Sequence, residues 1–160
     1  METFFSSLLK HFYTHYREPY PPCWMIFEAI SFGVVSHVYK RSKGDLRTPV
    51  AAQFGLHHDI LESWLHSLIV ARNVCAHSGR TWNRRFFKPV IPKMYAQHWP
   101  VESQDQLYVL CGMVHHLMKI IADGSNWSVR LRELINARPN VPLADMGFPE
   151  QWETSAFWEF

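Results

Sequence analysis

One segment constrains the fold of this chain more than any other, the run from His58 to Ala76. Placed at about 100° per residue, its apolar side chains fall within a single stripe, and Ser78-Gly79 ends the pattern. A long amphipathic helix is predicted, and it needs other helices to cover its apolar face. The residues that form the stripe are Ile60, Leu61, Trp64, Leu65, Leu68, Cys75 and Ala76.

Helical spacing of apolar residues recurs elsewhere, and no stretch alternates as a strand would. The pattern predicts further helices over residues 2–16, 24–40, 104–122 and 126–137. Residues 45–56 are expected to form only one or two short helical turns. Prolines at 89, 92 and 100 break the segment from 81 to 100, and we expect the tail from 139 to 160 to wrap the bundle without adding to its core. The prediction is one all-α domain over residues 1–160, a helical bundle with an irregular proline-rich segment and an irregular tail.

Composition narrows the functional classes. A hydrophobic fraction of 48% with 15% aromatic residues excludes a disordered chain. The three cysteines form no CxxC, so we expect reduced thiols in a helical core. His57-His58 and His115-His116 are adjacent pairs that point to different helix faces, so neither a metal nor another cofactor is predicted. No apolar run approaches the roughly 20 residues of a membrane span, and Glu2 makes a signal peptide unexpected, so a cytoplasmic location with no membrane partner is predicted.

The run Arg72-Asn73-Val74-Cys75-Ala76-His77 is the best candidate for chemistry. Arg72 falls inside the apolar stripe, where an unpaired charge would cost several kcal/mol, so it must find an anion, carbonyls or a cleft. Asn73 and His77 are four residues apart and lie on neighbouring faces. His77 lies about 140° around the helix from Arg72. The two side chains can therefore converge only at a frayed helix end or across a two-fold axis between two copies.

A basic and aromatic segment follows this run. No acidic residue lies between Glu62 and Glu102, and the same stretch holds six arginines and lysines with aromatic residues between them. Such a patch is typical of RNA or single-stranded DNA binding, whereas the alternative is that the arginines solvate a loop and the aromatic rings cap the core. The candidate RNA-binding residues are Arg80, Trp82, Asn83, Arg84, Arg85 and Lys88.

RNVCAH, from Arg72 to His77, resembles the R-x4-H motif of HEPN domains, many of which are metal-independent ribonucleases. Three longer blocks, Pro21–Gly33, Leu61–Phe86 and Asp145–Trp158, resemble the Abi-like family of bacterial abortive-infection proteins, a HEPN branch. The resemblance implies a HEPN-like bundle and a homodimeric endoribonuclease that cleaves RNA at a composite site, used in phage defence or as a toxin. It implies catalytic roles for Arg72, Asn73 and His77, and an antitoxin, either a protein or a small RNA, as a further partner.

The chain departs from the family pattern in two places. The further N-terminal region of comparable size that Abi-like proteins usually carry has no counterpart, so the chain is either a short member or the C-terminal part of a longer protein. Gly79 stands where some HEPN toxins have a tyrosine, so regulation through that tyrosine is not expected.

Two alternatives stay open. One is a non-catalytic HEPN module that binds RNA or a protein, in which Arg72 and Asn73 brace the dimer and His77 caps a helix end. The other is a DNA-binding regulator, which depends only on the possible helical turn from Pro49 to Gly55.

Overall fold

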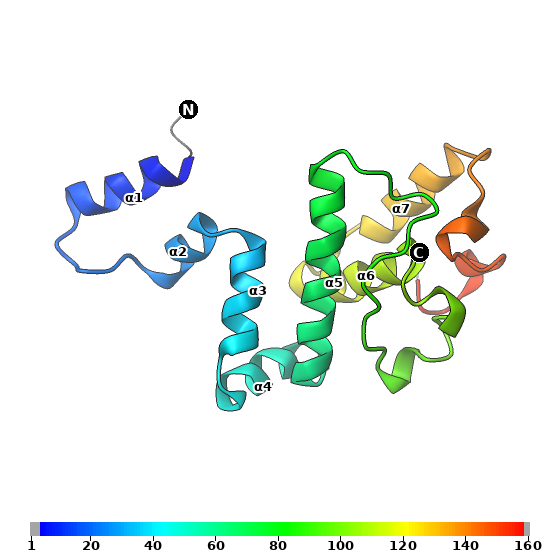
Figure 1. Ribbon diagram of the computed structural model, residues 1–160, viewed down its shortest axis with the longest axis horizontal. Coiled ribbons are helices and arrows are strands. Elements are labelled where there is room, and N and C mark those ends of the chain that lie inside the picture. The colour runs from blue at the N-terminus through cyan, green and yellow to red at the C-terminus, as the bar shows by residue number, and fades with distance from the viewer. Residues whose placement is uncertain (1–3, 159–160) are drawn as a thin grey trace. The chain divides into compact units, whose positions relative to one another are not determined.

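The computed structural model describes residues 4–158, apart from the side chains of residues 4–6 and 101. Its elements are α-helices and short 3-10 helices, and the described residues contain no strand, so the all-α prediction is confirmed (Figure 1). The α-helices are α1 (Phe4–His15), α2 (Cys23–Ala29), α3 (Phe32–Arg41), α4 (Gly44–Gln53), α5 (His58–Ala76), α6 (Leu107–Ile121) and α7 (Trp127–Asn136). The chain forms two compact units, the first ending at Ser42 and the second beginning at Lys43.

The first unit contains α1, α2 and α3. Phe12 of α1 and Met25 of α2 are buried, and these two helices pack against each other. The prediction of one helix over residues 24–40 was wrong, because the backbone is extended at Ile30 and Ser31. The Ser31 hydroxyl accepts a hydrogen bond from the N–H of Val34 at 3.4 Å, which caps a new helix that begins at Phe32.

In the second unit, α4 is longer than the one or two turns expected for residues 45–56. It continues through Pro49, which removes one backbone hydrogen bond from its interior. Two tertiary contacts offset that loss: Ala51 is fully buried, and the Arg47 guanidinium reaches the carboxylates of Asp59 and Glu62 on α5 at 3.2 and 2.6 Å. Packing has overridden the low helix propensity of this stretch.

The strongest predicted helix is confirmed, since α5 runs from His58 to Ala76. Its buried face carries Leu61, Trp64 and Ser67, all towards its N-terminal half. The Trp64 indole N–H donates to the Val90 carbonyl at 3.0 Å, and the Val90 N–H donates to the Ser63 hydroxyl at 2.9 Å. These two bonds fasten the irregular segment after α5 back onto the same helix.

The core of the second unit is aromatic and is centred on α6. Tyr108, Val109 and Met113 of this helix are fully buried, as is Trp99 from the segment before it. A methyl group at Gly112 would lie 2.8 Å from the Trp99 ring, so the glycine lets the indole lie directly on the helix backbone.

The tail takes part in this core, contrary to expectation. Phe148, Trp152 and Trp158 are 5%, 4% and 0% exposed. The Trp158 indole N–H donates to the Tyr108 hydroxyl at 3.3 Å. The prolines make the tail irregular. Burying three large aromatic side chains nevertheless contributes several kcal/mol to folding, and this burial holds the tail on the core.

Among residues 4–158, none of the helices is long and apolar enough to cross a membrane. The cytoplasmic location stays a prediction.

Candidate functional site

The motif Arg72–His77 forms the last turn of α5, and the way the helix ends fixes its geometry. His77 is the C-cap residue, and Ser78 follows in the left-handed region with φ of 52°. The N–H of Gly79 donates to the carbonyl of Val74 at 2.7 Å, and the N–H of Ser78 donates to that of Cys75 at 3.0 Å. This pair of bonds is a Schellman motif, which satisfies carbonyls that the helix end would leave open. The end of α5 is therefore closed and ordered rather than frayed.

Gly79 allows this closure through its size. A methyl group there would lie 2.9 Å from both the carbonyl oxygen and the side chain of Val74. Any larger residue would push the chain away from the helix end, so the glycine helps to hold His77 in place.

Arg72 and Asn73 are both exposed, so the expected burial of Arg72 in the apolar stripe was wrong. The buried face of α5 follows Leu61, Trp64 and Ser67, and the last turn of the helix is largely uncovered. The Arg72 guanidinium donates to the side-chain oxygen of Asn73 at 3.2 Å. An amide leaves the positive charge in place, so Arg72 keeps its charge for an anionic ligand.

His77 is exposed and is tied to Asn73 only through the backbone, with its N–H donating to the Asn73 carbonyl at 3.0 Å. Within the described residues the imidazole makes no hydrogen bond, either to Arg72 or to another group. One copy of the chain therefore pairs Arg72 with Asn73 and leaves the imidazole open to solvent.

The cations of the basic segment after the motif differ in whether another side chain of the protein already contacts them. Arg80 lies over the Trp82 ring at 5.8 Å from its centre, a cation–π contact that orders both side chains. Arg85 donates to the carboxylate of Asp105 at 2.5 Å and to the Glu102 carbonyl at 2.9 Å. Asn83, Arg84 and Lys88 are exposed, and Asn83 has a φ of 48°. Arg85 thus has its charge compensated by an acid outside the acid-free stretch, which the sequence could not reveal.

The sequence model of one protein family, described as Abi-like protein, matches residues 2–83, more than half of the 160 residues. The chain belongs to the Abi-like protein family. The match contains Arg72, Asn73 and His77 and the first of the three blocks, while Asp145–Trp158 lies outside it. The family points to a function related to abortive infection. Comparison with curated proteins and with solved structures gave no match.

Cys75 of this Abi-like protein lies at the surface, whereas its composition led us to expect a core position. Reduced thiols in a helical core were expected, and all three cysteines are free, but only Cys111 is buried. Burial raises the pKa of the Cys111 thiol to about 12, which makes it unreactive. Cys75 is exposed in the middle of the motif, where labelling can report on access to the end of α5.

One group of side chains could bring ligand atoms to a metal ion. Among the described residues, His57, His58 and Asp59 place one ligand atom each within 4.8 Å of one another. The adjacent histidines therefore lie closer together than their sequence positions suggested, with ring centres 4.1 Å apart. The Arg47 guanidinium lies 3.2 Å from the Asp59 carboxylate and would repel a cation there. Asp59 instead takes part in the ion pairs that join α4 to α5.

His116 connects three parts of the second unit through hydrogen bonds. The Tyr95 hydroxyl lies 2.6 Å from Nδ1 of His116, and Nε2 of His116 lies 2.8 Å from the Phe54 carbonyl. The carbonyl can only accept, so Nε2 carries the proton and Nδ1 accepts from Tyr95. Burial is the main cause that lowers the pKa of His116, so the ring stays neutral and links α4, α6 and the segment between α5 and α6.

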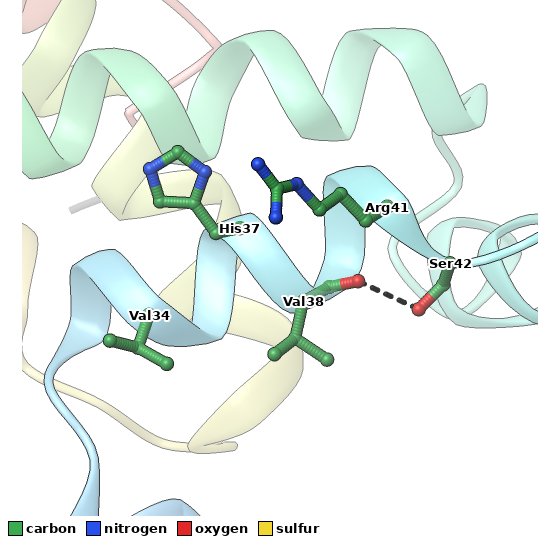
Figure 2. Close-up of a pocket in the computed structure, with 5 residues that line it drawn as sticks. All are labelled: Val34, His37, Val38, Arg41 and Ser42. Atoms are coloured by element: carbon green, nitrogen blue, oxygen red, sulfur yellow. Dashed lines mark hydrogen bonds between the residues drawn. The ribbon is translucent and has the colours of Figure 1, made fainter.

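In the first unit, a depression of about 430 Å³ follows α3. Figure 2 shows Val34 and Val38 pointing to one side of the helix and His37 and Arg41 to the other, with the Ser42 hydroxyl bonded to the Val38 carbonyl at 2.7 Å. All of its lining residues come from this helix and its cap, so it is a shallow surface without convergent polar groups.

Proposed function

We propose that this Abi-like protein is a metal-independent endoribonuclease with a HEPN-like fold, acting in bacterial phage defence or in a toxin–antitoxin system. The observation that carries the proposal is the exposed last turn of α5, where Arg72, Asn73 and His77 lie on a helix end closed by a Schellman motif. A helix end held in this way offers a cation and a proton-transfer group at fixed positions.

The chemistry needs no more than these groups. A base removes the proton from a ribose 2′-OH, and the 2′-oxygen attacks the adjacent phosphorus. The bond from phosphorus to the 5′-oxygen breaks, and an acid gives that oxygen a proton. An imidazole serves as base or acid near neutral pH, and a guanidinium binds the phosphate while negative charge builds on it. Asn73 holds the Arg72 guanidinium in position.

The motif of one chain contains one imidazole, that of His77, whereas the reaction needs both a base and an acid. We propose that two copies of α5 meet at their C-terminal ends, so that His77 of one chain is the base and His77 of the other the acid. The homodimer also explains why Arg72 and His77 need not meet within one chain.

The RNA strand would continue over the basic segment. Arg80, Arg84 and Lys88 are exposed and offer positive charge to phosphates, and Trp82 offers a ring beside Arg80. Because Arg85 already pairs with Asp105, we expect replacing Arg85 to weaken RNA binding less than replacing Arg84.

A second candidate function is a non-catalytic module that binds RNA or a partner protein. The observation that favours it is the hydrogen bond from Arg72 to Asn73, which gives the guanidinium a partner without any substrate. In that case Arg72 and Asn73 would order a docking surface, and His77 would only end the helix.

Cleavage of labelled single-stranded RNA in EDTA separates the two functions. We expect the wild-type chain to cleave and His77→Ala to lose at least about a hundredfold in rate, since a positioned acid or base contributes that much. The matched control is His66→Ala, another exposed histidine of α5, which should cleave as the wild type does. Equal cleavage by wild type and His77→Ala would exclude His77 as a catalytic residue. RNA binding without cleavage by the wild type would favour the second function.

The biological part of the proposal has its own test. Expression of the wild-type chain in a bacterial host should arrest growth, whereas His77→Ala should not. Rescue by a second factor, a protein or a small RNA, would identify the antitoxin.

A further inference from the structure

The first unit leaves a groove open along α3, and two neighbouring rows of side chains form its walls. The residues within each row are four positions apart: Val34, Val38 and Ser42 form one row, and His37 and Arg41 form the other. Figure 2 shows the two valines on one side of the helix and His37 and Arg41 on the other. Rows with this spacing are the ridges between which the side chains of a second helix insert when two helices pack. The groove therefore has the form of one half of a helix–helix contact.

The valine row is exposed, although it belongs to a unit with a small core. Val34 and Val38 are 45% and 47% exposed. Within residues 7–42, the large apolar side chains that are buried are those of Phe12 and Met25. A unit of about 40 residues buries too little apolar surface to be very stable by itself. A partner that covered the valine row would therefore add to the apolar surface that this unit buries.

The other row determines the charge that a partner should carry. The Arg41 guanidinium is always positively charged, and the His37 imidazole adds a second positive charge when it is protonated. Both side chains are exposed, and among residues 4–158 neither makes a hydrogen bond or an ion pair. The sequence has no acidic residue between Glu28 and Asp45, so α3 itself supplies no compensating charge. An acidic row on the partner would complement this row.

We propose that this groove binds an acidic amphipathic helix of a partner protein. Apolar side chains of the partner would pack on Val34 and Val38, and its glutamates or aspartates would face His37 and Arg41. The rows span Val34 to Ser42, about 12 Å along the helix axis, which matches two to three turns of a partner helix. The site lies in the first unit and does not depend on the proposed function of the motif on α5.

Other classes of ligand fit the groove less well. A volume of about 430 Å³ would hold a small molecule, but the groove lies along a single helix and lacks the convergent polar groups that orient such a ligand. An RNA backbone would find positive charge in His37 and Arg41, but it would leave the valine row uncovered. An amphipathic helix satisfies both rows at once.

Fluorescence anisotropy of the full chain with two labelled peptides tests the proposal. The first peptide has about 20 residues, enough to form a helix, with leucines in one row and glutamates in the next. The second peptide carries lysines in place of the glutamates. We expect micromolar binding of the glutamate peptide and at least about tenfold weaker binding of the lysine peptide. Added salt should weaken the binding of the glutamate peptide.

Arg41→Glu is the most informative variant, because it replaces a positive charge of the groove by a negative one. It should bind the lysine peptide more tightly than the glutamate peptide, which reverses the wild-type order. Arg17→Glu changes an exposed arginine of the same unit that does not line the groove, so it should keep that order. Val38→Ala should weaken binding of the glutamate peptide severalfold. Val50→Ala, an exposed valine of α4, is its matched control and should bind as the wild type does.

The proposal would be overturned if the wild type did not bind the glutamate peptide, or if it bound both peptides equally. An unchanged order in Arg41→Glu, or a reversed order in Arg17→Glu, would also contradict it. Displacement of the peptide from the wild type by single-stranded oligouridylate, but not from Arg41→Glu, would make RNA the ligand of the groove.

Two further measurements exclude occupants from the protein itself. Sedimentation of the wild type as a dimer that Val38→Ala dissociates would mean that a second copy covers the groove. Alanine favours a helix more than valine does, so Val38→Ala should not lower the thermal midpoint of unfolding if the position is uncovered. A lower midpoint would mean that the second unit of the same chain covers the groove, and either result would overturn the proposal.

Discussion

The two ends of α5 differ in what surrounds them. Near its N-terminus, Arg47 pairs with Asp59 and Glu62, Trp64 is fully buried, and Ser63 and Trp64 bond to the backbone of Val90. Over the last turn, Arg72, Asn73 and His77 are exposed, and the chain reversal that ends the helix follows directly. One helix therefore carries a buried anchor at one end and the candidate chemistry at the other.

The difference shows how one helix can expose polar side chains at one end while its other end is part of the core. Burial and ion pairs in the first half of α5 hold the helix in place. Because the helix is rigid, they also fix the position of its last turn, which needs no buried contacts of its own. Substitutions at the two ends should therefore separate: the buried end should govern the free energy of unfolding, and the exposed end should govern activity.

The largest effect on stability is expected from Trp64→Ala. Trp64 packs against Trp99 and His116 at ring-centre distances of 5.6 and 5.4 Å, and its loss leaves a large cavity as well as an open Val90 carbonyl. The free energy of unfolding should fall by about 3–5 kcal/mol, measured by urea denaturation. Cys75→Ala, at the exposed end of the same helix, is the control and should change it by less than about 0.5 kcal/mol. Similar losses in the two variants would contradict the contrast between the ends.

Gly79→Ala should have the next largest effect. The new methyl group would lie 2.9 Å from the Val74 carbonyl oxygen, a backbone atom that cannot move without opening the Schellman motif. The loss should be about 1–3 kcal/mol, with slower RNA cleavage because His77 shifts. Gly44→Ala is the matched control, since nothing lies within 4 Å of its added methyl group. A Gly79→Ala variant with unchanged thermal midpoint would show that the Schellman motif does not hold the helix end closed.

Ser78→Gly should have a smaller effect of opposite sign. Ser78 has a φ of 52°, which costs a residue with a side chain about 1 kcal/mol and costs glycine nothing. The gain is partly offset by the extra freedom of glycine in the unfolded chain, so the stability should rise by about 0.5 kcal/mol. Asn83→Gly, with φ of 48°, provides the comparison and should gain less, because asparagine tolerates this conformation. A loss of stability in Ser78→Gly would mean that the serine side chain contributes a contact of its own.

Local sequence patterns predicted those helices that have a strong apolar period. The bounds of α5 agree with the prediction, and α6 and α7 begin and end within three residues of it. Where the structure departs from the prediction, long-range contacts decide. The Arg47 ion pairs join α4, which continues past Pro49, to α5, and a ring contact and a hydrogen bond with Tyr108 hold Trp158 of the tail in the core. Both contacts join residues of different elements, which the periodic pattern within one helix does not reveal.

For the candidate site as well, the local pattern was predicted and the long-range contacts were not. The sequence identified Arg72, Asn73 and His77 as a unit, and α5 does place them on one helix end. The rotation of the helix could not be read from the stripe alone, because Leu65, Leu68 and Cys75 are apolar but not buried. Arg85 was grouped with the free cations because its partner, Asp105, lies 20 residues away. The left-handed conformation of Ser78 could not be predicted, because only the glycine that follows it indicated a helix end.

The smallest effect on stability is expected from Arg72→Ala, and it bears most directly on the contrast between the two ends of α5. Had Arg72 been buried in the apolar stripe, its removal would have disturbed the core or a dimer that it braces. Because the guanidinium is exposed and, among residues 4–158, bonds only to the neighbouring Asn73, the free energy of unfolding should change by less than about 0.5 kcal/mol. The same variant should lose RNA cleavage, since the cation that binds the phosphate is gone, and Arg72→Lys should restore only part of it because an ammonium lacks the planar pair of donors. Parallel urea denaturation, sedimentation and cleavage assays check all three statements. An Arg72→Ala variant that is destabilised or dissociated would instead make Arg72 a structural residue, and the exposed end of α5 would then contribute to stability as the buried end does.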